Sequence, residues 1–287
     1  MIKNKIILGS ANVNVDYGLK KNKLKINEFN SLLNFAFKKG IKTIDTSPQY
    51  GDSEKIIGLS KKNFNVITKI PKIPKKIKIK QIEKWIINII KKSKKNLKGK
   101  KIYGILLQNA EILLGSKAKI INETLLKLKD CGNFEKIGVS IYNFKTLNLI
   151  IDKLNIDFVQ LPYNVLDQRF KEKKLINKLK QKNIEIHARS IFLQGLLIEK
   201  NINLPKKMIG LEKAIFKWNT WISKKNINPV NACLAFVLQN KNINKIVIGF
   251  NSKNNFEDVI NYKKKKINFN KFNVKIAQNL LDPRKWS

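Results

Sequence analysis

Histidine, cysteine and arginine are scarce in this 287-residue chain, and each scarcity narrows the kinds of site that the protein can hold. A single histidine, His187, cannot build the histidine-rich zinc sites found in many enzymes, so we expect no metal. The two cysteines, Cys131 and Cys233, are far apart and form no CxxC motif. We therefore expect neither a disulfide framework nor a redox dithiol, which is typical of a protein of the reducing cytoplasm.

Long apolar runs are missing as well. The N-terminal residues contain no apolar run typical of a signal peptide, and no stretch approaches the ~20 residues of a membrane-spanning helix. We therefore expect a cytoplasmic protein without membrane association. No linker, repeat or low-complexity segment divides the chain, so residues 1–287 are expected to form a single domain.

Charge of one sign dominates the composition, because 59 basic residues face only 20 acidic ones and the formal net charge is +39. Such an excess ordinarily suggests nucleic-acid binding. Here the only arginines are Arg169, Arg189 and Arg284, and the lysines are spread among isoleucines and asparagines from end to end. This pattern indicates a general compositional bias, and we expect no specific nucleic-acid partner.

One stretch, residues 41–58, carries the clearest chemical signal. Residues 41–44 alternate apolar and polar side chains and predict a buried strand that ends at Asp45, with Tyr50 in the following loop. A short helix over residues 54–57 is expected next, capped by Asp52 or Ser53 and ended by Gly58. The next strand, residues 65–69, ends in Lys69. An aspartate, a tyrosine and a lysine at the tips of consecutive strands form a group that can handle protons.

This stretch resembles the aldo-keto reductase superfamily, which comprises nicotinamide-dependent carbonyl reductases built on a (β/α)8 barrel. The resemblance begins with D-T-S-x-x-Y-G-x-S-E at residues 45–54 and the T-K that ends the next strand. It continues with I-G-V-S at 137–140, V-Q-x-P-Y-N-x-L-D at 159–167 and R-S-x-F-L-Q-G-L at 189–196. Taken one by one, these residues also suit ordinary caps, loops and surface positions; together they favour the family.

The element pattern is consistent with an α/β TIM barrel. Strands are expected at residues 5–9, 41–44, 65–69, 103–108, 136–140, 157–164, 184–190 and 245–249. The clearest helical patterns lie at 26–39, 81–95, 120–130 and 171–182, and a last barrel helix opens after 250–252. Strands joined by helices favour a parallel sheet. The competing fold, a doubly wound open sheet, normally binds its nucleotide through a G-x-G-x-x-G turn, which this chain lacks.

The resemblance implies catalytic roles for residues at the carboxyl ends of the strands. Tyr50 matches the general acid, Lys69 the lysine that favours its ionisation, and Asp45 the carboxylate that pairs with that lysine. Gln108 stands where the family has a histidine. Its amide can hydrogen-bond a carbonyl oxygen but cannot relay a proton as imidazole can, so proton delivery is expected to be weaker.

The resemblance also implies a nicotinamide site. The candidate cofactor-binding residues are Ser10, Ala11, Asn12, Ser140, Gln160, Arg189, Ser190, Gly195, Gly249, Asn251, Ser252, Asn255 and Asp258. Ser140 and Gln160 match the pair that holds the carboxamide, and Arg189 replaces an aromatic residue that often stacks on the nicotinamide. For Arg189 and Ser252, plain barrel-end structure is the alternative. Lys253 can supply charge to a phosphate, which favours NADP over NAD.

Two functions of different classes remain open. The first is an NADP-dependent oxidoreductase that reduces a small-molecule carbonyl, namely an aldehyde, ketone or sugar, and acts as a monomer or weak homo-oligomer. The second is a cofactor-binding barrel with weak or lost turnover that serves as a regulatory or interaction subunit. Gln108 favours the second, whereas intact Asp45, Tyr50 and Lys69 favour the first. A third, nucleic-acid binding, has no recognisable module to support it.

Overall fold

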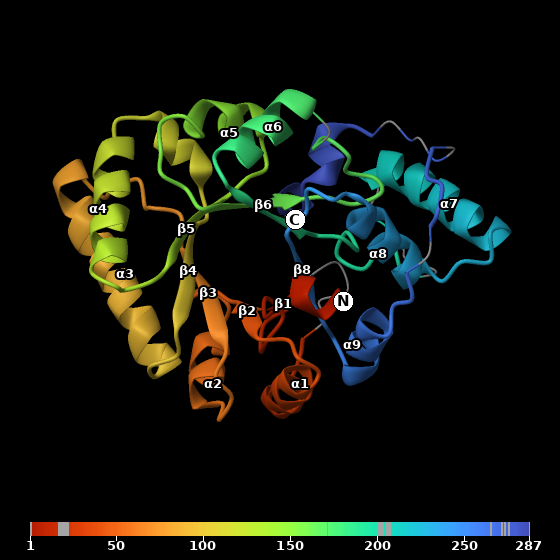
Figure 1. The fold of residues 1–287 in the computed structure, drawn as a ribbon, viewed down its shortest axis with the longest axis horizontal. Helices are drawn as coiled ribbons and strands as arrows, with labels where there is room; N and C mark the ends of the chain where they lie inside the picture. Colours follow the sequence, from red (N-terminus) through yellow and green to blue (C-terminus); the bar gives the residue numbers. More distant parts are fainter. Residues whose placement is uncertain are drawn as a thin grey trace.

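Eight parallel strands form a closed barrel in chain order, β1 to β8, in a computed structural model of the protein (Figure 1). The structure describes residues 2–16, 23–170, 172–199, 204, 208–264, 266–270, 272, 274 and 276–286. The strands are β1 (Ile6–Gly9), β2 (Thr43–Asp45), β3 (Asn65–Ile70), β4 (Ile102–Leu107), β5 (Lys136–Ser140), β6 (Phe158–Pro162), β7 (Glu185–Arg189) and β8 (Lys245–Gly249). The predicted (β/α)8 fold is confirmed, and each expected strand overlaps an observed one.

Helices surround the strands (Figure 1). They are α1 (Ile26–Lys38), α2 (Ser53–Leu59), α3 (Ile82–Leu97), α4 (Ala118–Asp130), α5 (Phe144–Ile150), α6 (Lys173–Gln181), α7 (Ile209–Lys224), α8 (Pro229–Gln239) and α9 (Lys253–Ile260). Short 3-10 helices are η1 (Ile2–Lys5), η2 (Ile79–Gln81), η3 (Ala110–Leu114), η5 (Gln278–Leu281) and η6 (Pro283–Lys285). The predicted helix at 171–182 begins at a residue outside the described ones, and α6 accounts for the rest. Among the residues that the structure describes, no helix is long and apolar enough to cross a membrane.

The end of α2 differs from the prediction. Gly58 does not end the helix, which runs on to Leu59. A Cβ atom on Gly58 would lie 2.2 Å from the Asn96 carbonyl oxygen, so the glycine permits close approach of α2 to the end of α3. Asp52 occupies the N-cap position without a capping hydrogen bond. Its carboxylate instead accepts hydrogen bonds from Lys55 at 3.0 Å and Asn14 at 3.4 Å.

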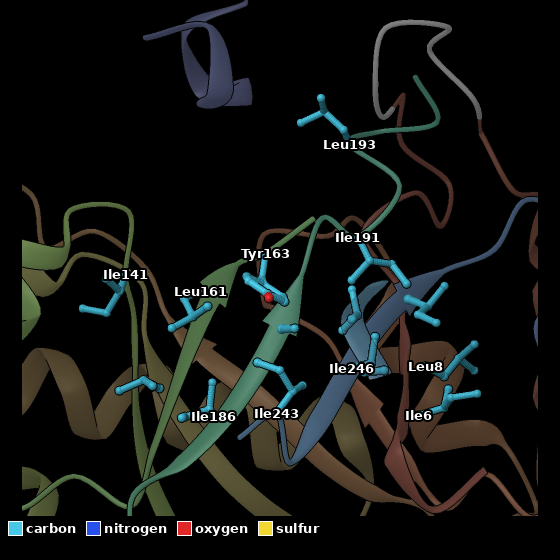
Figure 2. Packing of buried hydrophobic residues seen from close by; sticks show 14 of the residues in the cluster. Ile6, Leu8, Ile141, Leu161, Tyr163, Ile186, Ile191, Leu193, Ile243 and Ile246 are labelled. Carbon is cyan, nitrogen blue, oxygen red and sulfur yellow. The ribbon is translucent and has the colours of Figure 1, made fainter. Parts of the chain in front are cut away.

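Successive residues of each strand point alternately into the barrel interior and outward to the helices. Ile7, Ile67, Leu106 and Phe158 form the apolar layer inside the barrel. The Phe158 ring fills the centre because Gly138 leaves room for it: a Cβ atom there would lie 2.3 Å from the ring. The remaining strand residues, among them Ile6, Leu8, Leu161, Ile186 and Ile246, contribute to the core between barrel and helices (Figure 2).

The C-terminal segment returns to the barrel and is anchored against α7. Trp221 stacks on Phe269 with ring centroids 5.5 Å apart, and Trp218 meets Phe272 edge to face at 5.3 Å. Trp286 is buried and donates from Nε1 to the Leu280 carbonyl oxygen at 3.0 Å. The segment thus returns to the carboxyl ends of the strands, where Pro283 and Arg284 of η6 lie near Ser140 and Arg189.

Candidate active site

A cavity of about 660 Å³ opens at the carboxyl ends of the strands. Every strand contributes to it a residue that lies at or near its carboxyl end. These residues are Gly9, Asp45, Lys69, Gln108, Ser140, Gln160, Arg189 and Gly249, in the order β1 to β8. The carboxyl ends of parallel strands meet at one end of a barrel, and active sites of such barrels lie there. The cavity has the size of an ordinary small-molecule or cofactor site.

Asp45 and Lys69 form a buried ion pair at the floor of the cavity, with side chains 5% and 4% exposed. Asp45 Oδ1 accepts from Lys69 Nζ, and Asp45 Oδ2 accepts from Gln160 Nε2 at 2.8 Å. Lys69 also donates to the Thr46 carbonyl oxygen at 2.8 Å. With its carboxylate bonded on both oxygens, Asp45 fixes the position of the ammonium group.

The ammonium of Lys69 lies next to Tyr50, which lines the same cavity. Lys69 Nζ is 4.7 Å from the centroid of the Tyr50 ring. Burial alone lowers the pKa of Lys69, but the charges of Asp45 and Tyr50 and hydrogen bonds to both residues outweigh it, so the pKa is raised. Lys69 therefore stays positively charged at neutral pH and favours the ionised form of a neighbouring phenol.

Gln108 lines the cavity with an amide that makes no side-chain hydrogen bond among the described residues. Its Oε1 is buried without a partner, while its backbone N–H donates to the Ile70 carbonyl oxygen at 3.1 Å and fixes the residue at the end of β4. An unsatisfied buried polar group costs free energy, on the order of 1–3 kcal/mol.

The structure brings most of the predicted cofactor-binding residues to this cavity. They are Ser10, Ala11, Asn12, Ser140, Gln160, Arg189, Ser190, Gly195, Gly249 and Asn251. Ser252, Asn255 and Asp258 lie outside the cavity lining. Ser252 is the N-cap of α9, and its Oγ accepts from the Asn255 backbone at 3.2 Å and contacts Asn255 Oδ1 at 2.9 Å. Asp258 is exposed on the same helix.

One side of the cavity wall, at β1 and β8, is formed by backbone without side chains. Gly9 and Gly249 lie side by side in β1 and β8 and present bare backbone to the cavity. Asn12 joins the loops that follow these strands, donating to the Phe250 carbonyl oxygen at 3.1 Å and to Asn251 Oδ1 at 2.8 Å. The residues present therefore fit a bound dinucleotide.

The loop after β7 contains several residues with positive φ. Ser190, Leu193 and Gln194 have φ angles of 55°, 47° and 53°, and Gly195 follows at 94°. Left-handed backbone is uncommon for residues other than glycine and is concentrated at functional sites. All of these except Leu193 line the cavity.

Several residues that line the cavity were not among the sequence candidates. They include Gln49, Lys72, Asn109, Tyr142, Gln194 and Arg284. The scarcity of arginine is the one sequence signal that points to Arg284. Tyr142 and Gln49 had none, because they follow a strand or motif at positions that any loop residue can take. Among the described residues, no group of three or more histidine, cysteine or acidic side chains could hold a metal ion.

The chain is a (β/α)8 barrel with a polar cavity at the carboxyl ends of its strands, lined by Asp45, Lys69 and Tyr50 among others. The model of the aldo/keto reductase family matches residues 5–278, and the chain therefore belongs to this family. Its members are oxidoreductases that use nicotinamide cofactors to reduce carbonyl compounds. No curated protein matches the chain in sequence.

Solved structures with the same fold include two from bacteria. An aldo-keto reductase of Bacillus halodurans in its holo form has a TM-score of 0.68 and 14% identity, over 89% of this chain and 85% of that one. A glycerol dehydrogenase of Gluconobacter oxydans has a TM-score of 0.66 and 17% identity, over 96% of this chain and 88% of that one. At these identities the similarity establishes the fold alone.

Proposed function

We propose that the protein reduces the carbonyl group of a small molecule to an alcohol, using NADPH, with Tyr50 as the general acid. The observation that carries the proposal is the contact of Lys69 with the Tyr50 ring inside a cavity built from all eight strand ends. When bound, NADPH supplies the hydride. The residues of the chain supply the proton and the electrostatic environment.

Proton transfer is the step in which the cluster acts. As the carbonyl oxygen gains negative charge, the Tyr50 hydroxyl donates its proton to it. A phenol with an ordinary pKa near ~10 is a weak acid, and the ammonium of Lys69 stabilises the phenolate left behind. Asp45 holds that ammonium in place through the buried ion pair. The amide of Gln108 orients the carbonyl oxygen by donating from Nε2.

The cofactor would lie between the floor of the cavity and the β1–β8 side. Gln160 gives its Nε2 to Asp45, which leaves its Oε1 to accept from the carboxamide, together with Ser140. Gly9 and Gly249 allow close approach of the dinucleotide backbone. Lys253 begins α9, and its ammonium lies over the Phe35 ring at 4.5 Å; binding of a 2′-phosphate by this side chain would favour NADP over NAD.

A screen of NADPH and NADH oxidation with aldehydes, ketones and aldoses tests the function, and Tyr50→Phe tests the acid. We expect the variant to lose nearly all carbonyl reduction, by ~10²-fold or more, while NADPH affinity measured by fluorescence stays within ~2-fold. Tyr103→Phe is the matched control, because Tyr103 lies near the amino end of β4 and outside the cavity lining, and this change should leave turnover intact. Wild-type turnover in Tyr50→Phe would refute the assignment.

A second candidate function rests on Gln108, which replaces the histidine of the family. A barrel that binds NADPH but turns over no carbonyl compound would serve as a regulatory or interaction subunit. Tight NADPH binding without oxidation of the cofactor by any substrate in the screen would favour this function over the first.

A further inference from the structure

The three arginines of the chain converge on one residue, Tyr142, at the cavity. The Cζ atoms of Arg189 and Arg284 lie 3.9 Å and 3.3 Å from the centroid of the Tyr142 ring. Arg169 Nη1 donates to the Tyr142 carbonyl oxygen at 3.2 Å. Since lysine supplies all but three of the 59 basic residues, arginine at this one place indicates a need for the planar guanidinium group.

Arg169 and Arg284 differ in how many guanidinium nitrogens already donate hydrogen bonds within the protein. Arg169 donates from Nε and Nη2 to Asp167 and from Nη1 to the Tyr142 carbonyl oxygen, so each of its three nitrogens makes a hydrogen bond. Arg284 gives Nε and Nη2 to Asp282. Its Nη1 has no hydrogen bond within the described part of the chain, and its side chain is 51% exposed. Arg284 therefore keeps donors for a further oxygen atom.

Arg189 also lacks a strong partner. It donates to the Ser190 hydroxyl at 3.4 Å and to the Ile141 carbonyl oxygen at 3.3 Å, and both bonds are long. No ion pair of Arg189 occurs among the residues that the structure describes. A half-buried guanidinium bonded only to neutral oxygens is ready to accept a carboxylate or phosphate, which it binds through two parallel hydrogen bonds.

The cavity as a whole has an excess of positive charge. Its lining cations are Lys69, Lys72, Arg189 and Arg284, and its lining carboxylates are Asp45 and Glu199. Asp45 is committed to Lys69 in the buried pair. From outside the lining, Asp282 and Glu111 act on Arg284 electrostatically. Asp282 also acts electrostatically on Arg189, but neither Lys72 nor Arg189 forms an ion pair among the described residues.

Tyr142 lies two residues after Ser140, an expected carboxamide contact, so the cluster adjoins the nicotinamide end of the expected cofactor site and lies across the barrel from the loops after β1 and β8. Tyr142 follows β5, which lies four strands from β1 in the closed order β1 to β8. The expected cofactor residues Ser10, Asn12 and Asn251 follow β1 and β8. Arg284 joins Tyr142 from η6, whose segment covers the cavity. Arg284 lines the same cavity as Tyr50 and Gln108, the residues proposed to act on the carbonyl group.

We propose that the substrate is an anionic carbonyl compound whose carboxylate or phosphate is bound by Arg284 and Arg189 beside Tyr142. This inference rests on the proposed reductase function and narrows its substrate class. The amide side chains of Gln49, Gln108 and Asn109 in the same cavity suit a polyhydroxylated molecule such as a sugar acid or sugar phosphate, because an amide can both donate and accept.

Matched pairs of substrates that differ in charge test the proposal. NADPH oxidation is measured with D-glucuronate against D-glucose and with glyceraldehyde 3-phosphate against glyceraldehyde, which separates carboxylate from phosphate. We expect kcat/KM to be ~10- to 100-fold higher for the charged member of at least one pair. In Arg284→Gln the ratio of kcat/KM for the charged substrate to that for the neutral one should fall toward one, because KM for the charged substrate rises. Arg284→Lys should restore part of this ratio. Lys285→Gln, which removes the same charge one residue along η6, is the matched control and should leave the ratio unchanged.

The outcomes are distinguishable from those that decide the reductase function. Isothermal titration of the NADP-loaded protein with glucuronate and with glucose reports anion binding even if no substrate turns over. Weaker glucuronate binding in Arg284→Gln supports the proposal. Equal charged-to-neutral ratios in the wild type, or an Arg284→Gln variant that changes only NADPH affinity or only Tm, would overturn it, since the arginines would then hold the cofactor or merely anchor η6.

Discussion

At the scale of single residues, the motif D-T-S-x-x-Y-G-x-S-E divides into residues for chemistry and residues for structure. Asp45 and Tyr50 line the cavity. Thr46 and Ser53 hydrogen-bond each other at 2.9 Å, and buried Glu54 accepts from Thr68 at 2.7 Å and from Asn96 at 3.0 Å. These bonds tie α2 to β3 and α3. The motif is long because it contains both the residues that handle protons and the residues whose hydrogen bonds hold α2 against β3 and α3.

Gln108→His tests the one departure at the catalytic centre. The imidazole can hydrogen-bond the carbonyl oxygen and assist proton delivery, which is typically worth ~10²- to 10⁴-fold. We expect a rise in kcat of about 10-fold with little change in KM, because the proton moves only in the transition state. Steady-state kinetics with the best substrate of the screen measures it. Asn109→His, which places an imidazole one residue further along, is the control and should give no gain. Loss of activity of Gln108→His on every substrate would mean that the amide itself is required.

The limits of residue-level reasoning are visible in the same cavity. The sequence predicts four of the cavity residues, because each lies at a strand end or in a motif and strand ends converge in a parallel barrel. These residues are Asp45, Tyr50, Lys69 and Gln108. Arg284 and Tyr142 meet across 142 positions of sequence only because the C-terminal segment folds back over the barrel. No local pattern encodes that return, so a contact of this kind depends on tertiary packing.

At the scale of elements, the amino ends of β5 and β7 are joined by a charged cluster. Glu185 accepts from Lys136 and contacts His187 Nε2 at 3.0 Å. His187 is buried and stacks on Phe158 with ring centroids 4.7 Å apart. Burial lowers the pKa of His187, so the ring is neutral at neutral pH and donates from Nε2 to Glu185. Alternation along β7 places His187 inside the barrel; its sequence position did not reveal this link to Glu185 and Lys136.

This cluster predicts an acid dependence of stability. The hydrogen bond from His187 lowers the pKa of Glu185 most; burial raises it, and the bond and charge of Lys136 lower it further, giving about 2 instead of 4.5. A carboxylate with a depressed pKa stabilises the fold fully above its unfolded pKa and loses that contribution as pH falls through its folded pKa. We therefore expect the free energy of unfolding of the wild type to drop between pH 4.5 and 2 by on the order of 1 kcal/mol more than that of Glu185→Gln, after allowance for solvent screening.

Urea denaturation across this pH range measures the difference. Glu135→Gln removes an exposed carboxylate that is paired with Lys101 on the surface and serves as the matched control. Parallel pH profiles for wild type and Glu185→Gln would show that the cluster contributes nothing to acid stability.

At the scale of the whole molecule, the fold was predictable because its signals repeat. Each strand is a short apolar segment, each is followed by a helix or loop of ordinary length, and right-handed crossovers leave few ways to arrange them. Lengths of individual elements were less predictable: Gly58, a typical helix end, lies inside α2 because the backbone of α3 packs against it. The helices α5, α7 and α8 carried no clear sequence boundaries, since their ends are set by packing on the barrel.

The net charge of +39 leads to the last prediction, which concerns the surface. The lysines at 75, 76, 78 and 80 are exposed, but like the rest they form part of a charge that is spread over the chain. A diffuse positive surface binds duplex DNA through phosphates alone, so we expect equal affinity for two unrelated sequences, with Kd no tighter than ~10⁻⁶ M at physiological salt. Fluorescence anisotropy at 50 and 200 mM NaCl should show at least ~10-fold weakening, since bound phosphates release counterions. Replacing these four lysines with glutamine should change the affinity by less than ~3-fold, because many other lysines remain. A large loss in that variant, or tight binding of one sequence at high salt, would instead reveal a localised nucleic-acid site.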